Sequence, residues 1–299
     1  MGLISNAIDS AFESFGSSMM NVGEWMLSAG YNVWKGSGDI AVQYAQKDPM
    51  SVTNAWSTVT GSIYSIRLSV AAALAVLFFV LGWLNESIDI RTNFTLESMF
   101  RFFVRYVITA SLIVNSLTLA SGITRCATAL ATSVTAEVEA NEADGLFDEM
   151  KEELDDDDAD GSTWLAYGLV AMFGGVIGGL VIIVCAIQLV LAVMSRLFRM
   201  LLCIPFAPVA FAGFAGGREF SQSGIAWLKT YTGYCLEALV IILAIDISYG
   251  LFQDTSAFGS VDGVVGVVLG ICEYCLPMIT ACACVRGADT VVRRCLGLG

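Results

Sequence analysis

The sequence contains no histidine, and only 14% of its residues are charged. Without histidine the chain lacks the most common general base of enzymes and the most common protein ligand of metal ions. The motifs of phosphate-binding loops, serine hydrolases, zinc proteases and dinucleotide-binding proteins are also missing. These absences argue against an enzyme, and we predict no catalytic residue, no metal site and no cofactor.

The chain is unusually rich in apolar residues. Hydrophobic residues make up 56% of the chain, and the mean hydropathy is +0.72. A soluble globular domain carries about 25% charged residues, so this composition excludes that class. The sequence therefore predicts an all-α polytopic membrane protein.

The longest apolar run extends from Trp164 to Ser195 and contains no Asp, Glu, Lys or Arg. It exceeds the roughly 20 residues that a helix needs to cross a bilayer. Inside it two GxxxG patterns interleave, and such patterns let a second helix backbone approach closely. We predict a packing face there, either within one bundle or between subunits, formed by Gly174, Gly175, Gly178 and Gly179.

The remaining apolar runs divide the chain into four parts. Residues 1–65 contain no span and predict an amphipathic helical region, which Asp48-Pro49 interrupts before a second, Ser/Thr-rich helix. Residues 66–123 hold the first two spans, residues 124–163 form an acidic loop, and residues 164–299 hold the last three. The five predicted spans are Leu68–Leu84, Phe102–Gly122, Trp164–Ser195, Ala226–Leu251 and Val264–Val285.

Charge orients these spans. Lys and Arg concentrate in the connections between spans one and two and between spans three and four, and after span five, whereas 13 of the 28 acidic residues lie between Glu137 and Asp160. By the positive-inside rule the N-terminus is outside, the acidic loop faces out and the C-terminus is cytoplasmic. We predict a cytoplasmic docking surface formed by Arg196, Arg199, Arg218, Lys229, Arg286, Arg293 and Arg294.

Two features of the last part suggest a pore. Residues 200–217 are apolar but contain Pro205 and Pro208, which predict a re-entrant or interfacial elbow on the cytoplasmic side. Three carboxylates, Glu237, Asp246 and Glu273, lie within predicted spans. An ionised side chain at the centre of a bilayer costs at least about 2.5 kcal/mol, so such residues face a cavity or a partner.

A series of short motifs lies between residues 195 and 238. They read Ser195-Arg196-Leu197-Phe198-Arg199, Ile204-Pro205-Phe206-Ala207-Pro208, Phe214-Ala215-Gly216-Gly217, Ser221-Gln222-Ser223-Gly224, Trp227-Leu228-Lys229-Thr230-Tyr231 and Gly233-Tyr234-Cys235-Leu236-Glu237-Ala238. With them the chain resembles the TrbL-type family of polytopic inner-membrane channel components of conjugative type IV secretion systems, in the form found on Gram-positive mobile elements. The general plan of five spans and a large outer loop is also similar.

The resemblance implies a membrane channel or scaffold that helps pass a relaxase-linked single DNA strand or a protein across the bacterial cytoplasmic membrane. The implied partners are membrane lipids, further copies of the chain, other type IV secretion subunits including ATPases, and transiently the single-stranded DNA or the relaxase. The acidic outer loop would repel phosphate, which argues against contact between that loop and DNA.

Two alternatives stay open at the level of the sequence. A secondary transporter or an ion channel would use the intramembrane carboxylates, although no internal repeat of the kind that many transporters show is found. A purely structural membrane scaffold would share every feature except a conducting lumen.

Overall fold

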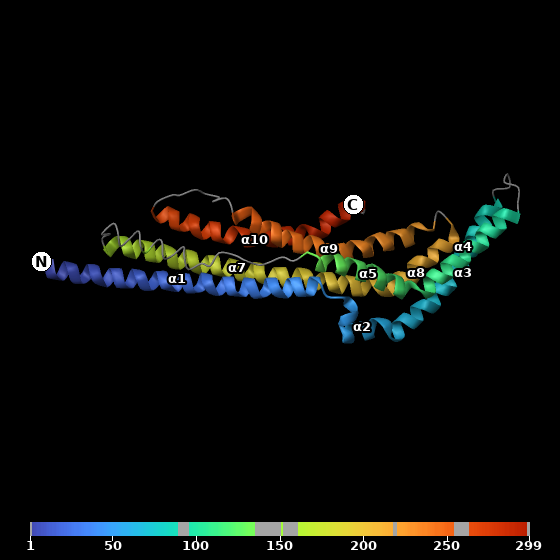
Figure 1. The fold of residues 1–299 in the computed structure, drawn as a ribbon, viewed down its shortest axis with the longest axis horizontal. Coiled ribbons are helices and arrows are strands. Elements are labelled where there is room, and N and C mark those ends of the chain that lie inside the picture. Colours follow the sequence, from blue (N-terminus) through green and yellow to red (C-terminus); the bar gives the residue numbers. More distant parts are fainter. Residues whose placement is uncertain are drawn as a thin grey trace. The chain divides into compact units, whose positions relative to one another are not determined.

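The computed structural model describes residues 2–88, 96–134, 151, 161–217, 220–253 and 263–297. All regular secondary structure in these residues is helical (Figure 1), which confirms the predicted all-α class for this part of the chain. The chain divides into two compact units. The first comprises Met1–Gln43, Thr135–Ala192 and Ile241–Arg286, and the second comprises Tyr44–Val134, Val193–Val240 and Gly287–Gly299.

In the first unit, α1 (Gly2–Ala45) packs along α7 (Gly161–Cys203). The contact is so close that a Cβ atom added to Gly168 would lie 2.5 Å from the carbonyl oxygen of Gly16. A Cβ atom added to Gly175 would lie 2.5 Å from the carbonyl oxygen of Gly23. Both pairs advance by seven residues on each helix, so the two helices are parallel and meet through a glycine repeat of heptad spacing.

A second face of α7 contacts α10 (Val264–Cys295). A Cβ atom added to Gly174 would lie 2.8 Å from Cδ1 of Ile271, and one added to Gly178 would lie 3.1 Å from Cγ2 of the same side chain. Further along, the thiol of Cys282 donates to Oε1 of Gln188 at 3.3 Å. Helices α7 and α10 are therefore also parallel. The remaining part of the unit comes from the second half of α9 (Gln222–Gln253).

The second unit is built from shorter helices. The chain leaves α1 through a 3-10 turn, η1 (Pro49–Ser51), where Oδ1 of Asp48 accepts a hydrogen bond from the backbone N–H of Met50 at 3.2 Å. This confirms the predicted break at Asp48-Pro49. The helices that follow are α2 (Thr53–Thr60), α3 (Ser62–Ile88), α4 (Leu96–Val114), α5 (Ser116–Thr132), η2 (Ile204–Phe206), α8 (Ala207–Ala212) and η3 (Gly213–Gly216).

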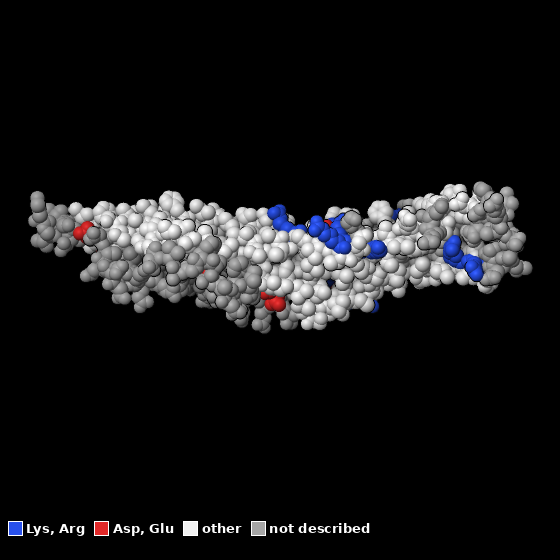
Figure 2. Space-filling model, turned by 90° about the horizontal axis from the view of Figure 1, so that it is seen from above, with Lys and Arg blue, Asp and Glu red and all other residues white. Residues whose placement is uncertain are grey.

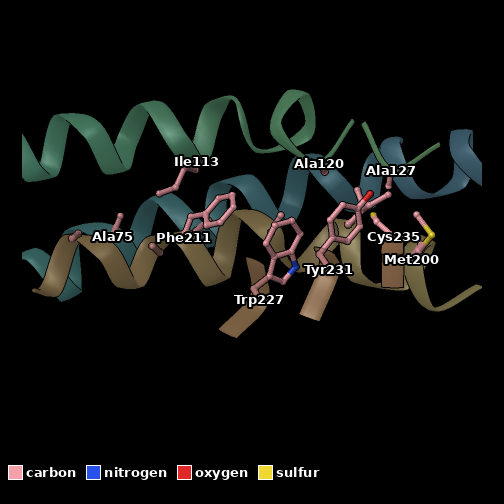
Figure 3. Close-up of a cluster of buried hydrophobic side chains, with 14 residues drawn as sticks. Ala75, Ile113, Ala120, Ala127, Met200, Phe211, Trp227, Tyr231 and Cys235 are labelled. Carbon is pink, nitrogen blue, oxygen red and sulfur yellow. The ribbon is translucent and has the colours of Figure 1, made fainter. Parts of the chain in front are cut away.

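The buried core of this unit contains three aromatic rings among smaller side chains, mainly alanine (Figure 3). The ring of Trp227 stacks on that of Tyr231 with centroids 5.0 Å apart, and it meets the ring of Phe211 edge-on at the same distance. The hydroxyl groups of Tyr231 and Thr124 are 2.7 Å apart, so the polar end of the buried tyrosine is hydrogen-bonded. The core thus joins α5, α8 and α9.

The predicted second span is bent rather than straight. The helical course bends by 66° between α4 and α5, with Asn115 at the break at φ −94° and ψ 11°. The Asn115 side chain donates to the carbonyl of Ser111 at 2.9 Å, and the Ser116 hydroxyl donates to that of Ile113 at 2.8 Å. Side chains that bond nearby carbonyls in this way compete with the helical backbone and bend it. Helix α5 also continues to Thr132, beyond the expected start of the acidic loop at residue 124.

The prolines after α7 do not reverse the chain as the elbow prediction expects. Pro205 and Pro208 lie in the first turns of η2 and α8, where a missing N–H costs nothing. The helical course continues to Gly216, and the chain turns only after it, at Gly217 with φ 91°. Then α9 runs antiparallel to the end of α7, because Trp227 bonds the carbonyl of Cys203 and Tyr234 accepts from Arg196.

Four helical stretches in the described residues are long and apolar enough to cross a membrane, or five if the bent pair is one span. They are Thr53–Asn85, Gly161–Gly216, Gln222–Ser248 and Val264–Cys295, with Met99–Val114 and Ser116–Thr132 as the bent pair. Large apolar side chains such as Phe100, Phe173 and Val265 are exposed along them. The chain is therefore a multi-pass membrane protein, and its helices extend further than the predicted spans at several ends.

Candidate functional site: an arginine network in the second unit

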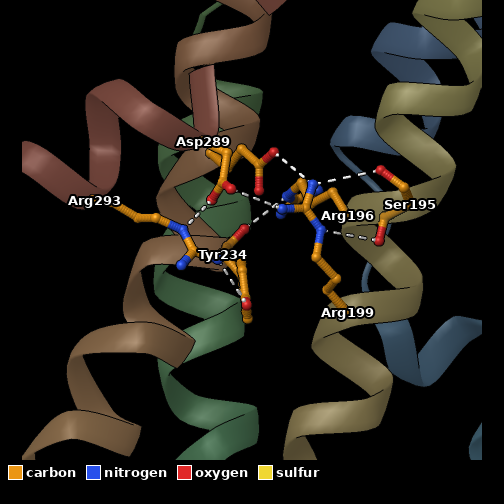
Figure 4. Close-up of polar contacts among 7 residues, drawn as sticks. Ser195, Arg196, Arg199, Tyr234, Asp289 and Arg293 are labelled. Carbon is orange, nitrogen blue, oxygen red and sulfur yellow. Dashed lines mark hydrogen bonds and ion pairs between the residues drawn. The ribbon is translucent and has the colours of Figure 1, made fainter. Parts of the chain in front are cut away.

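A network of charged and aromatic side chains joins the end of α7, the first half of α9 and the end of α10 (Figure 4). All of its members belong to the second unit. We call it the arginine network, and it consists of Arg196, Arg199, Tyr234, Glu237, Asp289 and Arg293.

Arg196 is the buried anchor of the network, with only 2% of its surface exposed. Its Nε donates to the carbonyl of Tyr234 at 2.8 Å, Nη1 to that of Ala45 at 3.1 Å and Nη2 to that of Cys235 at 3.2 Å. Ala45 is the last residue of α1, so its carbonyl has no partner within the helix. The guanidinium group therefore joins three helices through backbone carbonyls. Among the described residues no carboxylate lies within ion-pair distance of it.

Arg199, one turn further along α7, connects two carboxylates. Its Nη2 lies 3.1 Å from Oε1 of Glu237 on α9, and its Nη1 lies 3.2 Å from Oδ2 of Asp289 on α10. The Glu237 side chain is only 4% exposed. Its second oxygen, Oε2, is buried and has no hydrogen-bond partner among the described residues.

Arg293 closes the network from the C-terminal part of α10. Its Nε lies 2.8 Å from Oδ1 of Asp289, one turn earlier on the same helix. Its Nη2 donates to the hydroxyl of Tyr234 at 3.2 Å. The Tyr234 ring also faces both cations, with the guanidinium carbons of Arg199 and Arg293 at 5.3 and 5.7 Å from its centroid. These distances are within the range of cation–π attraction.

The network contains three arginines and two carboxylates, so one positive charge is left for the carbonyls and the Tyr234 ring to stabilise. Its hydrogen bonds cross-link helices that are far apart in the sequence. A buried, bidentate arginine forms such links better than lysine, because the planar guanidinium group donates in several fixed directions. The arrangement can hold the ends of these helices in fixed positions relative to one another.

The structure distributes the predicted docking residues between two environments. Arg196, Arg199 and Arg293 have their hydrogen-bonding groups turned to partners inside the network. Lys229, Arg286 and Arg294 are exposed, whereas Arg218 lies outside the described residues. Figure 2 shows that Lys and Arg gather in separate groups on the face it presents. The cytoplasmic docking surface stays a prediction.

The other predicted site residues also fall into distinct places. Glu237 belongs to the arginine network, whereas Asp246 is exposed and Glu273 is partly exposed, both in the first unit. Pro205 and Pro208 are buried at helix starts. Among the four glycines, Gly175 and Gly179 contact the backbone of α1, and Gly174 and Gly178 contact side chains of α10.

Sequence reasoning missed two sets of residues. Asp289 was not singled out, although its spacing of four from Arg293 is typical of an ion pair on one helix face. The glycines of α1, namely Gly16, Gly23 and Gly30, repeat every seven residues in the sequence. Gly161, Gly168 and Gly175 repeat at the same interval on α7. This matching period could have indicated the contact between the two helices.

Comparison with known proteins gives one match, to a protein family. A protein-family model described as TrbL/VirB6 plasmid conjugal transfer protein matches residues 72–286, which include most of both units and all of the arginine network except Asp289 and Arg293. No curated protein and no solved structure matches the chain.

Proposed function

Because the chain belongs to the TrbL/VirB6 family of plasmid conjugal transfer proteins, we propose that it is a membrane-embedded subunit of a conjugative type IV secretion machine in the bacterial cytoplasmic membrane. In this role it helps to pass a relaxase-linked single DNA strand or a protein across that membrane. The observation that carries the proposal is the family match over residues 72–286, which extends from the first candidate span into the last.

The arginine network supports a structural role for this part of the chain. Its groups are engaged in links between helices, as the three carbonyl bonds of Arg196 illustrate. We propose that the chain forms homo-oligomers and contacts other type IV secretion subunits, including ATPases. Its exposed cations Lys229, Arg286 and Arg294 are candidates for those contacts on the cytoplasmic side.

The alternative function, a secondary transporter or ion channel, needs an intramembrane carboxylate that exchanges a proton or an ion. Glu237 fits this need poorly, because Arg199 holds its Oε1 at 3.1 Å and is itself held by Asp289. The carboxylate therefore has a fixed structural partner on a neighbouring helix. We therefore assign Glu237 a structural role in the arginine network rather than a role in transport.

Deletion and complementation test the proposal. The coding sequence is deleted from a conjugative element that carries it, and transfer to a recipient strain is measured together with element copy number in the donor. We expect transfer to fall by at least a thousandfold with copy number unchanged, and to return when the full-length chain is supplied from elsewhere.

Crosslinking addresses the second part of the proposal. In donors that carry the complementing chain, formaldehyde crosslinking and immunoprecipitation of this chain should recover other secretion subunits. If transfer continued at the wild-type rate after deletion, the assignment to the conjugation machine would be wrong. If transfer were lost but no secretion subunit were recovered, the chain would act outside the machine.

A further inference from the structure

The second unit contains a pocket of about 550 Å³ that is separate from the arginine network. One face of α4 forms most of it, and residues near the turn between η3 and α9 complete it. Its lining consists of Arg101, Val104, Arg105, Ile108, Thr109, Leu112, Phe214, Gly217 and Ser221. From these features we propose that the pocket binds one anionic phospholipid.

The charged end of the pocket lies along the first half of α4. Arg101 and Arg105 are one helical turn apart, and both are exposed. The Arg105 guanidinium group rests over the ring of Phe102 at 5.4 Å from its centroid, and it has no hydrogen-bond or ion-pair partner among the described residues. Arg101 also interacts with another group of the chain, so the argument rests mainly on Arg105.

Gly217 lets the backbone of the turn come close to this arginine. Its φ of 91° favours glycine, and a Cβ atom at this position would lie 3.1 Å from Nη1 of Arg105. The wall opposite α4 is therefore formed without a side chain at the point where the guanidinium group lies. Arg105 is exposed, so its planar guanidinium donors can bond the oxygen atoms of a phosphate.

The other end of the pocket is mainly apolar, although Thr109 also lines it. Val104, Ile108 and Leu112 follow one another at intervals of four along α4, and Phe214 faces the same space. Because α4 rises about 1.5 Å per residue, the lining from Arg101 to Leu112 extends roughly 16 Å along the helix. Charge at one end and apolar side chains at the other match a lipid, whose phosphate and acyl chain are joined in the same order.

A nucleic acid strand is the other polyanion that this protein could meet, but it fits the pocket less well. A strand needs a continuous row of cations for successive phosphates, with aromatic faces for its bases. The pocket has cations at one end only, and it offers a single aromatic ring, that of Phe214. The orientation expected from charge places the start of α4 on the cytoplasmic side, where anionic lipid headgroups attract basic residues.

Native mass spectrometry of the full-length, detergent-purified protein tests the proposal. The probes are dioleoyl phosphatidylglycerol, dioleoyl phosphatidylcholine and the short-chain dihexanoyl phosphatidylglycerol. We expect wild-type protein to bind the long-chain anionic lipid at least tenfold better than phosphatidylcholine. The double variant Arg101→Gln/Arg105→Gln should lose this preference. The matched control Lys35→Gln/Arg125→Gln removes two exposed cations outside the pocket and should keep it.

A variant of the apolar end separates a lipid from a bare phosphate or a nucleic acid. Ile108→Gln should lower the affinity for the long-chain lipid several-fold and leave the affinity for the short-chain lipid unchanged. If the pocket variant and the control lost the preference for anionic lipid equally, the proposal would be overturned. Binding would then depend on the overall positive charge of the protein and not on this pocket. An unchanged long-chain affinity in Ile108→Gln, with displacement by a single-stranded oligonucleotide, would also overturn it in favour of a nucleic acid site.

Discussion

Arg196 shows how one side chain can fix the positions of three helices. A buried arginine is costly unless its donors are satisfied, and here each of its three nitrogen atoms reaches a backbone carbonyl. Carbonyls are fixed by the helices that carry them, so these bonds require a defined register of α7 against α9 and the end of α1. The buried donors of Arg196 must be hydrogen-bonded, and they can be so only when the helices are packed in this register.

Glu237 provides a test of the network at a single position. Glu237→Lys would put four cations against one carboxylate in a buried site, and breaking a buried ion pair in this way costs about 3–5 kcal/mol. Glu237→Gln keeps the shape and one hydrogen bond, so we expect a loss of only about 1–2 kcal/mol. The measurement is the unfolding free energy of the detergent-solubilised protein in a denaturant series.

Asp246→Lys is the matched control for this pair of variants. Asp246 lies on the same helix but is exposed, so the same change of charge should alter stability by less than about 0.5 kcal/mol. Equal losses in Glu237→Lys and Asp246→Lys would show that the network does not stabilise the fold. If both Glu237 variants were as stable as wild type while transfer failed, the carboxylate would have a transport role.

The sequence identified Arg196, Arg199 and Glu237 as important but did not identify their partners. Their partners depend on which turn of α7 faces which turn of α9 and α10, and periodicity within one helix does not contain this information. Tyr234 of α9 contacts Arg293 of α10, and Asp289 of α10 contacts Arg199 of α7, so only the packed structure brings these pairs together. Pairing across helices was therefore the part of the site that sequence reasoning could not reach.

At the scale of helices, the contact between α1 and α7 rests on glycine. Gly23 faces the backbone of Ala171, where an added Cβ atom would lie 2.9 Å from the carbonyl carbon. We expect Gly23→Ala to force the helices apart and to destabilise the protein by about 1–3 kcal/mol. The midpoint of thermal unfolding in mild detergent should fall accordingly.

Gly36→Ala is the control on the same helix, because an added Cβ atom at Gly36 meets nothing within 4 Å. Alanine is a better helix former than glycine by up to about 1 kcal/mol, so this variant should be as stable as wild type or more stable. A lower unfolding midpoint in both variants would mean that replacing glycine in α1 destabilises the protein whether or not the glycine contacts α7. No drop in either would mean that α1 does not pack on α7 in the membrane.

The bend between α4 and α5 marks a second limit of sequence reasoning. The apolar run from Phe102 to Gly122 has the length of one straight span, and it contains no proline. The bend arises at Asn115 and Ser116, whose side chains bond carbonyls three or four residues earlier. Ser116 also reaches Tyr64 of α3 at 2.9 Å, so tertiary contact helps to select the bent form. A hydropathy profile shows that a span can contain Asn115 and Ser116, but it does not predict that the helix bends there.

At the scale of the whole chain, the helix directions alternate as a multi-pass protein requires. In the second unit α3 runs parallel to η2, α8 and η3, because Arg67 lies over Phe206 at 4.4 Å and Gly82 contacts Gly216. Helix α9 then runs antiparallel to the end of α7. In the first unit α10 runs parallel to α7. Contacts give these relative directions, and only charge assigns them to the two sides of the membrane.

Cysteine labelling tests that assignment in intact cells. The nine native cysteines are all free, so they are first replaced by serine or alanine. Asp157→Cys lies in the acidic loop and Gly299→Cys at the C-terminus, outside the described residues. We expect a membrane-impermeant maleimide to label Asp157→Cys in intact cells, and Gly299→Cys only after the membrane is opened. Lys and Arg resist translocation, so the connections that contain them should remain inside. The opposite labelling pattern would invert the chain in the membrane and would move the lipid pocket at Arg105 to the outer leaflet.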